Sequence, residues 1–129
     1  MPALVRLVPQ RHDADCTVAA LAMLLSVSYE EALLVMNDPR VLAEGAYLTQ
    51  IVTAADYFGV TLRKLTRWNV TTREGIARVN YKKDSARPHV VVVRRGLLFD
   101  TNQEVWTPDV YLAEQRATFG TLLQIVEGE

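Results

Sequence analysis

Residues 15–25 read DCTVAALAMLL, and this stretch decides the fold. After the polar Asp15 and the thiol of Cys16 it is rich in alanine, leucine and methionine, which favour helix. It is apolar on nearly every side of that helix. A helix of this kind is surrounded by other elements, so it belongs in the middle of a domain. The stretch therefore predicts a central helix that begins at Cys16.

Two more helices are expected in the first half of the chain. Ser28 and Glu31 have the spacing of a capping box, and Asn37-Asp38-Pro39 would end the helix that follows them. Apolar residues then recur at helical spacing from Leu48 to Phe58, and Gly59 stands where a helix C-cap is expected.

The second half of the chain alternates apolar and polar residues, which is typical of strands. The strands expected there are Val60–Leu65, Val79–Tyr81, His89–Arg95, Leu97–Asp100 and a closing strand Phe119–Val126, with a short helix from Thr107-Pro108 to Glu114. Helices grouped ahead of strands indicate the α+β class, with N-terminal helices packed on a C-terminal antiparallel sheet.

Length and composition are those of an ordinary globular protein. The chain has 129 residues, half of them apolar and 22% charged, so we expect one domain over residues 1–129 and exclude a disordered or collagen-like chain. Its longest apolar runs are far shorter than the roughly 20 residues that cross a bilayer, and residues 1–10 lack a signal-peptide core. We therefore expect a soluble, cytoplasmic protein with no membrane partner.

Positive charge is concentrated in one window of the chain. Ten basic residues and only Glu74 and Asp84 as acids lie between Arg63 and Arg95. The window predicts either a solvated strand face or a patch for an acidic partner. A net charge of −1 and a sequence pI near 6.1 argue against a nucleic-acid partner.

The single cysteine, Cys16, excludes an internal disulfide and a cysteine-based metal cluster. It stands where the unpaired N–H groups and the dipole of a helix stabilise a thiolate, although a lone cysteine can also be inert core filling. A nucleophilic thiol needs a base, and the chain offers His12 and His89. His12 lies in a polar loop, whereas His89 is the polar first residue of an apolar strand.

A two-residue turn at Arg95-Gly96 would make residues face each other when their numbers sum to 191. His89 then lies opposite Asn102, and Asp100 is its diagonal neighbour on the same face of the sheet. Either side chain could orient the imidazole. A three-residue turn would instead place Asp100 on the other face.

Two further features concern the loop before the helix. Gln10 lies six residues before Cys16, and its amide could join the Cys16 N–H in stabilising an oxyanion, although alone it is an ordinary loop residue. His12, Asp13 and Asp15 cluster like metal ligands, but nothing else at suitable spacing completes a shell, so no metal is expected. Asp15 is instead expected to cap the helix.

In this order, Gln10, Asp15-Cys16, His89 and Asp100 resemble the papain-like cysteine peptidases. They are most similar to the bacteriocin-processing, double-glycine leader peptidases and their stand-alone relatives. The resemblance covers roughly residues 8–105. It implies a papain-like fold with a Cys-His-Asp catalytic triad, in which Cys16 is the nucleophile, His89 its proton partner, Asp100 the orienting acid and Gln10 the oxyanion donor.

Two positions depart from that family. Thr17-Val18 stands where glycine or a small pair usually follows the cysteine, and Thr101 stands where proline usually follows the acid. A β-branched Thr17 beside the nucleophile could narrow the site.

The resulting hypothesis is a hydrolase, a thiol protease or related amidohydrolase, that acts on a peptide or protein substrate without a cofactor. Deamidation and acyl transfer would use the same residues. The alternative is a non-catalytic papain-like docking module that binds an acidic peptide through the basic window.

Overall fold

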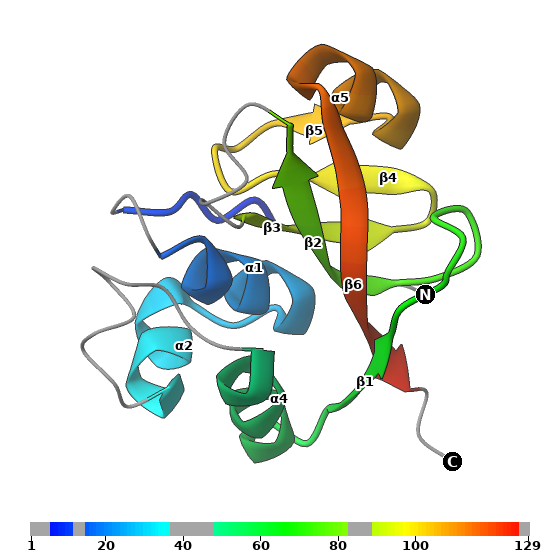
Figure 1. Cartoon of the computed structure of the whole chain (residues 1–129). Helices are drawn as coiled ribbons and strands as arrows, with labels where there is room; N and C mark the ends of the chain where they lie inside the picture. Colours follow the sequence, from blue (N-terminus) through cyan, green and yellow to red (C-terminus); the bar gives the residue numbers. More distant parts are fainter. Residues whose placement is uncertain (1–5, 12–14, 37–47, 83–88, 127–129) are drawn as a thin grey trace.

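The structure is a computed structural model that describes residues 6–11, 15–36, 48–82 and 89–126. Among these residues, three helices come first and gather on one side of a sheet, while a fourth lies at the far end of that sheet (Figure 1). The helices are α1 (Cys16–Leu25), α2 (Tyr29–Met36), α4 (Leu48–Tyr57) and α5 (Pro108–Gln115). The expectation of helices ahead of strands is confirmed.

One antiparallel sheet of six strands carries the second half of the chain, in the order β1-β6-β2-β3-β4-β5. Its strands are β1 (Thr61–Leu65), β2 (Gly75–Tyr81), β3 (His89–Arg94), β4 (Leu97–Phe99), β5 (Val105–Trp106) and β6 (Ala117–Val126). The last strand, β6, inserts between β1 and β2. The strand that comes last in sequence order therefore lies in the interior of the sheet.

Apolar side chains cover both faces of the sheet. Val90 and Val92 on β3 pack with the helices α1, α2 and α4, whereas Val91 and Val93 pack on the opposite face with Tyr111 of α5. This alternation follows from the pleat of a strand, in which successive side chains point to opposite faces. Burial on both faces explains why β3 reads as an unbroken run of valines.

Helix α1 is the buried centre that its composition predicts. Its residues from Cys16 to Leu24 are all buried, and it packs against β3, α2 and α4. Among the residues that the structure describes, no single helix is long and apolar enough to cross a membrane; α1 and α2 reach that length and apolarity only as a pair bent by 115°.

Two of the predicted signals at helix ends are confirmed. Ser28 Oγ accepts a hydrogen bond from the Glu31 N–H at 3.0 Å, and Glu31 Oε1 accepts one from the Ser28 N–H at 3.0 Å, which is a complete capping box. Gly59 has a φ of 80°, the left-handed conformation that ends α4. The expected stop at Asn37-Asp38-Pro39 lies outside the described residues.

The β3–β4 hairpin has the predicted register. Val92 pairs with Phe99 and Val93 with Leu98, so the numbers of facing residues sum to 191. Arg95 and Gly96 have φ values of 55° and 78°. A type I′ turn needs a positive φ at both of its central residues, and this turn keeps His89 and Asp100 on one face.

The sequence prediction missed the first residues of β2 and β6 and the whole of β5. Strand β2 begins at Gly75 rather than Val79, and the short strand β5 was not expected at all. A Cβ at Gly75 would meet the backbone oxygen of Leu123 at 1.9 Å, so this strand passes too close to β6 for any other residue. The glycine and the arginine of β2 interrupt the alternation of apolar and polar residues that marks a strand in the sequence. The full length of β2 is evident only from its pairing with β6 and β3.

Candidate active site

Cys16 is the first residue of α1, and it is buried, with 7% of its surface exposed. Asp15 precedes it at the N-cap, and the Asp15 carbonyl oxygen accepts the Val18 N–H at 3.0 Å. Asp15 is the N-cap residue, as expected, but its carboxylate makes no cap hydrogen bond to the helix.

The Asp15 carboxylate turns away from the helix instead and is completely buried. It accepts a hydrogen bond from the Tyr29 hydroxyl and another from the Arg11 N–H at 3.1 Å. The Arg11 guanidinium lies 4.2 Å from the centroid of the Tyr29 ring and 2.8 Å from Glu30. Asp15 therefore links the start of α1 to the segment that carries Gln10, because its carboxylate accepts the Arg11 N–H of that segment.

His89 opens β3 and is held by Asp100. His89 Nε2 lies 2.8 Å from Asp100 Oδ1, and both side chains are largely buried. Asn102 was the other candidate partner for the imidazole, but its side-chain NH₂ donates to Glu104 Oε1 at 2.9 Å. The structure therefore pairs the imidazole with Asp100.

Cys16 is the second partner of the imidazole. Burial disfavours the charged ring, but hydrogen bonds to Asp100 and Cys16 and the charges of both groups outweigh it and raise the pKa of His89 from 6.5 to about 9. With Nε2 engaged by Asp100, the ring has Nδ1 left for the sulfur. A protonated imidazole beside a thiol is the arrangement that sustains a thiolate–imidazolium pair.

Asp100 is kept ionised by its surroundings. Burial by itself raises the pKa of this carboxyl, but hydrogen bonds from His89, the Thr101 N–H and Tyr111, together with the charge of His89, lower it below the ordinary value. The Thr101 N–H lies 2.7 Å from Asp100 Oδ1. A carboxylate with several donors favours its charged form over its neutral form.

Tyr111 and Tyr81 extend this network behind Asp100. Their hydroxyl oxygens lie 2.8 Å apart, and Tyr111 is 1% exposed. Burial, the bond to Tyr81 and the nearby charge of Asp100 raise the pKa of Tyr111. Sequence reasoning missed both residues. The signal for Tyr111 was its position as an aromatic residue in a short polar helix that starts with Pro108. The structure shows that Pro108 and Tyr111 are the buried residues of this helix, α5.

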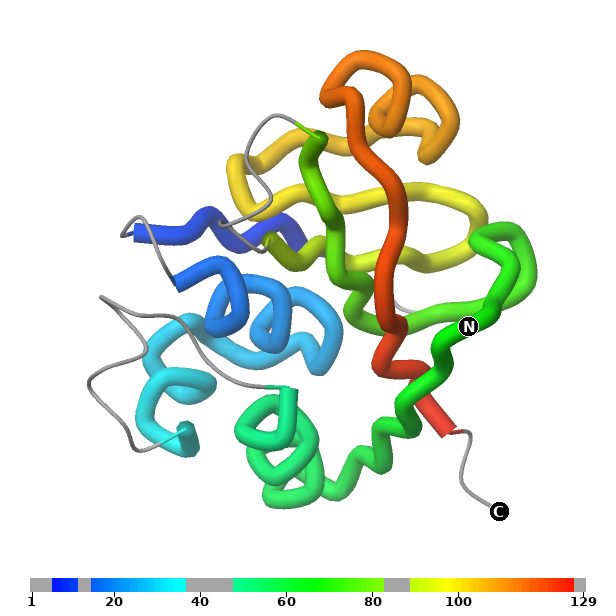
Figure 2. The backbone as a smooth tube through the Cα atoms, viewed as in Figure 1, coloured from blue at the N-terminus to red at the C-terminus, as the bar shows by residue number. Residues whose placement is uncertain are grey.

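Gln10 reaches the same place from the N-terminal segment. The tube in Figure 2 shows this segment, in blue, beside the start of β3 and the loop after β4. The Gln10 N–H donates to the Thr101 carbonyl at 2.7 Å, and Gln10 Oε1 accepts the Thr101 hydroxyl at 2.5 Å. The candidates are thus linked as Cys16–His89–Asp100, with Gln10 joined to Asp100 through Thr101.

The metal-like cluster at His12, Asp13 and Asp15 and the basic window from Arg63 to Arg95 are described only in part. His12 and Asp13 lie outside the described residues, and within the described part of the chain no three His, Cys, Asp or Glu side chains form a group that could hold a metal ion. In the basic window, Lys83, Asp84 and Arg87 also lie outside it. The exposed cations of this window that the structure describes are Arg63, Lys64, Arg67, Arg73, Lys82 and Arg95.

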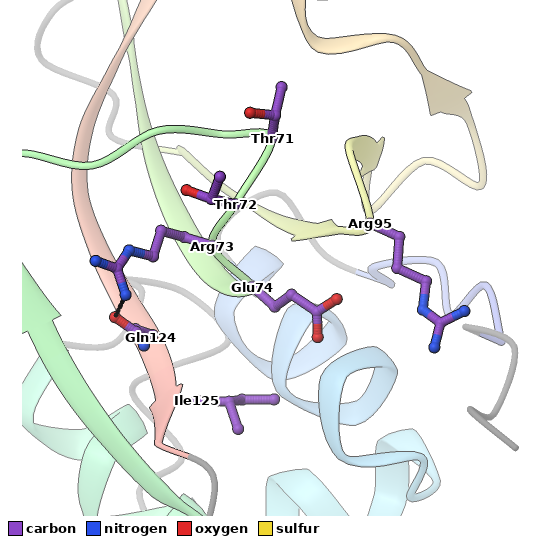
Figure 3. Close-up of a pocket in the computed structure, with 7 residues that line it drawn as sticks. All are labelled: Thr71, Thr72, Arg73, Glu74, Arg95, Gln124 and Ile125. Carbon is purple, nitrogen blue, oxygen red and sulfur yellow. Dashed lines mark hydrogen bonds between the residues drawn. The ribbon is translucent and has the colours of Figure 1, made fainter.

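A pocket of about 390 Å³ lies at the end of β3 opposite His89 (Figure 3). Arg73 points toward Gln124, with 3.4 Å between the guanidinium and the amide oxygen, and away from Glu74 and Arg95. Glu74 also pairs with Arg94 at 3.4 Å. The pocket therefore has mixed charge, and none of the candidate site residues lines it.

Comparison with known proteins shows the fold. No protein-family model matches the sequence, and no curated protein matches it. Among solved structures, the crystal structure of a double-glycine motif protease from an AMS/PCAT transporter, in complex with the leader peptide, is similar with a TM-score of 0.60. The two chains are 17% identical, and the match covers 96% of this chain and 94% of that chain. The expected papain-like α+β fold, with the cysteine at the start of the central helix, is confirmed.

Proposed function

We propose that the protein is a cysteine peptidase, or a related thiol amidohydrolase, that hydrolyses a peptide or amide bond. The proposed catalytic residues are Cys16, His89, Asp100 and Gln10. The observation that carries the proposal is the contact of His89 with both Cys16 and Asp100, which raises the pKa of the imidazole to about 9. A buried histidine in an apolar strand that served packing alone would have its pKa lowered by burial, not raised.

The proposed mechanism assigns one step to each group. The Cys16 sulfur attacks the carbonyl carbon and forms a C–S bond, while the Gln10 amide and the Cys16 N–H stabilise the oxyanion. The C–N bond then breaks, and His89 gives its proton to the leaving amine. Water, deprotonated by His89, attacks the thioester, and the carboxylic acid leaves as the thiol forms again. Asp100 keeps the imidazole in the required orientation throughout.

A peptide is the substrate class that the comparison supports. The similar protease was crystallised with a leader peptide bound, and the match extends over nearly the whole of both chains. Deamidation and acyl transfer use the same thioester and differ only in the bond attacked or the acceptor. Mass spectrometry of the products separates these outcomes, because only hydrolysis of a main-chain bond yields two fragments.

The first test needs no substrate. We expect iodoacetamide to alkylate Cys16 rapidly at pH 6–7 in the wild type, and far more slowly in His89→Ala, because that variant loses the cation beside the sulfur. Asn102→Ala is the matched control, since Asn102 contacts Glu104 rather than His89. A slow rate that His89→Ala leaves unchanged contradicts the proposal.

The second test is turnover of a broad peptide library by the wild type and by Cys16→Ala. We expect fragments from the wild type alone. If the wild type cleaves nothing while both proteins bind the same acidic peptides, the protein is instead a docking module, for which the exposed cations Arg63, Lys64 and Arg67 are the candidate contacts. Such binding would weaken with added salt, because exposed charges are screened.

A further inference from the structure

Thr101 is a buried residue whose polar groups all serve two of the proposed catalytic residues. It is 1% exposed and directly follows Asp100. Its N–H donates to Asp100 Oδ1 at 2.7 Å, its hydroxyl donates to Gln10 Oε1 at 2.5 Å, and its carbonyl accepts the Gln10 N–H at 2.7 Å. None of its hydrogen-bonding groups is directed to a neighbouring strand in these contacts, so its bonds join the site rather than the sheet.

Gln10 depends on such a contact more than the other candidates do. Cys16 is positioned by a helix and His89 by a strand, whereas Gln10 lies in a segment without regular secondary structure. A glutamine side chain has several rotatable bonds, and an oxyanion donor acts only when its N–H is held at the place where the charge develops. Its rotamers must therefore be restricted by a partner.

The Thr101 hydroxyl is a partner that restricts both position and orientation. A hydroxyl that donates to Oε1 selects the oxygen end of the amide, so the NH₂ end is turned away from Thr101. The backbone bond from the Gln10 N–H to the Thr101 carbonyl holds the main chain of the glutamine at the same time. Two bonds to one residue define the direction of the amide far better than either bond alone.

We propose that Thr101 is a positioning residue that holds the Gln10 amide with its donor end toward the oxyanion and, through its N–H, the Asp100 carboxylate toward His89. This inference rests on the proposed function. Thr101 itself does not touch the reacting atoms. It makes the oxyanion donor and the histidine-orienting acid parts of one hydrogen-bonded unit.

The hydroxyl can be tested separately from the N–H. Thr101→Val has nearly the same shape and keeps the N–H, but it removes the bond to Gln10. Alkylation by iodoacetamide requires the Cys16–His89 pair and forms no oxyanion, whereas amide hydrolysis requires both. We therefore expect Thr101→Val to change the alkylation rate by no more than about twofold. We expect the same variant to lower kcat about 10- to 100-fold, a fall no larger than that caused by removing an oxyanion donor outright.

Three further variants make the test specific. Thr101→Ser retains a hydroxyl and should restore most of kcat, with KM unchanged in both variants. Adding Thr101→Val to Gln10→Ala should cause no further loss, because the two changes remove one function. Thr107→Val is the matched control, since Thr107 makes no side-chain cap hydrogen bond. Equal kcat in Thr101→Val and wild type overturns the inference, and so does a parallel fall in alkylation and turnover.

The position of Gln10 can be read without any substrate. In the wild type we expect the side-chain NH₂ resonances of Gln10 to be dispersed and to exchange slowly with water, and in Thr101→Val to resemble those of a solvated glutamine. Unchanged resonances overturn the inference whatever the turnover. If they change as expected but the wild type hydrolyses no peptide, the proposed function fails while the contact between Thr101 and Gln10 stands.

Discussion

His89 Nε2 lies 2.8 Å from Asp100 Oδ1 although the two residues are 11 positions apart in the sequence. A two-residue turn at Arg95-Gly96 folds β4 back along β3 and places both side chains on one face. The carboxylate accepts from one ring nitrogen and so selects the orientation in which the other can reach Cys16. The hairpin register is therefore part of the proposed chemistry as well as of the fold.

Asp100→Asn is expected to lower the pKa of His89 from about 9 toward 6.5, because a neutral amide no longer stabilises the imidazolium. Turnover should fall on the order of 10²–10⁴-fold, as happens when an amide replaces the orienting acid of a triad. NMR titration of the His89 ring and steady-state kinetics measure the two effects. Asn102→Ala should change neither; a larger loss there than in Asp100→Asn would contradict the assigned partner.

The free energy of unfolding is expected to fall at alkaline pH because His89 loses its proton there. The pKa of His89 in the folded protein, about 9, is above its ordinary value of 6.5, so its contribution is complete below about pH 6.5 and is lost as the pH rises through 9. Urea unfolding at pH 6 and pH 9.5 measures the loss. His89→Gln should flatten this decline, and an identical decline in that variant would show that other groups cause it.

Asp100 is expected to make stability depend on pH in the opposite direction, with the loss at acidic pH. Because its pKa is lowered in the folded protein, its contribution to stability is present above about pH 3.8 and is lost as the pH falls further. Asp100→Asn should therefore unfold with a weaker dependence on acid than the wild type. Unfolding followed by circular dichroism between pH 5 and pH 2 measures it.

Tyr111→Phe removes the hydroxyl behind Asp100 and keeps the buried ring. We expect the pKa of Asp100 to rise, since one donor to its charged form is lost. We also expect the free energy of unfolding to fall by about 1–3 kcal/mol, because the Tyr81 hydroxyl and the carboxylate lose a buried partner. Carboxyl carbon NMR and urea unfolding measure these changes. Tyr57→Phe, at a ring that is 77% exposed, is the control and should be neutral.

The turn at Arg95-Gly96 offers a test of the hairpin alone. Gly96→Ala should cost about 1–2 kcal/mol, because its φ of 78° is unfavourable for a residue with a Cβ although nothing lies within 4 Å. Arg95→Asn should stabilise the protein, since asparagine tolerates the φ of 55° better than arginine does. Urea unfolding measures both. Equal destabilisation by the two changes would argue against a type I′ turn in solution.

The features predicted correctly depend on neighbouring residues. The capping box at Ser28 and Glu31, the end of α4 at Gly59 and the β3–β4 register all follow from spacings of a few residues. Asp15 is the expected N-cap residue, but its carboxylate makes no cap hydrogen bond, because it accepts one from Tyr29, 14 residues away. Local rules take no account of such a distant competitor.

The sequence by itself determined the α+β class, the buried α1 helix that begins at Cys16 and a hairpin at Arg95-Gly96, while it left the register of that hairpin open between a two-residue and a three-residue turn. Only the tertiary structure decided that Asp100 rather than Asn102 holds the imidazole, that Tyr111 stands behind it, and that Thr101 holds Gln10. The first group follows from periodicity and turn geometry within one segment. The second depends on contacts between segments such as residues 10 and 101, which are adjacent only after the chain has folded.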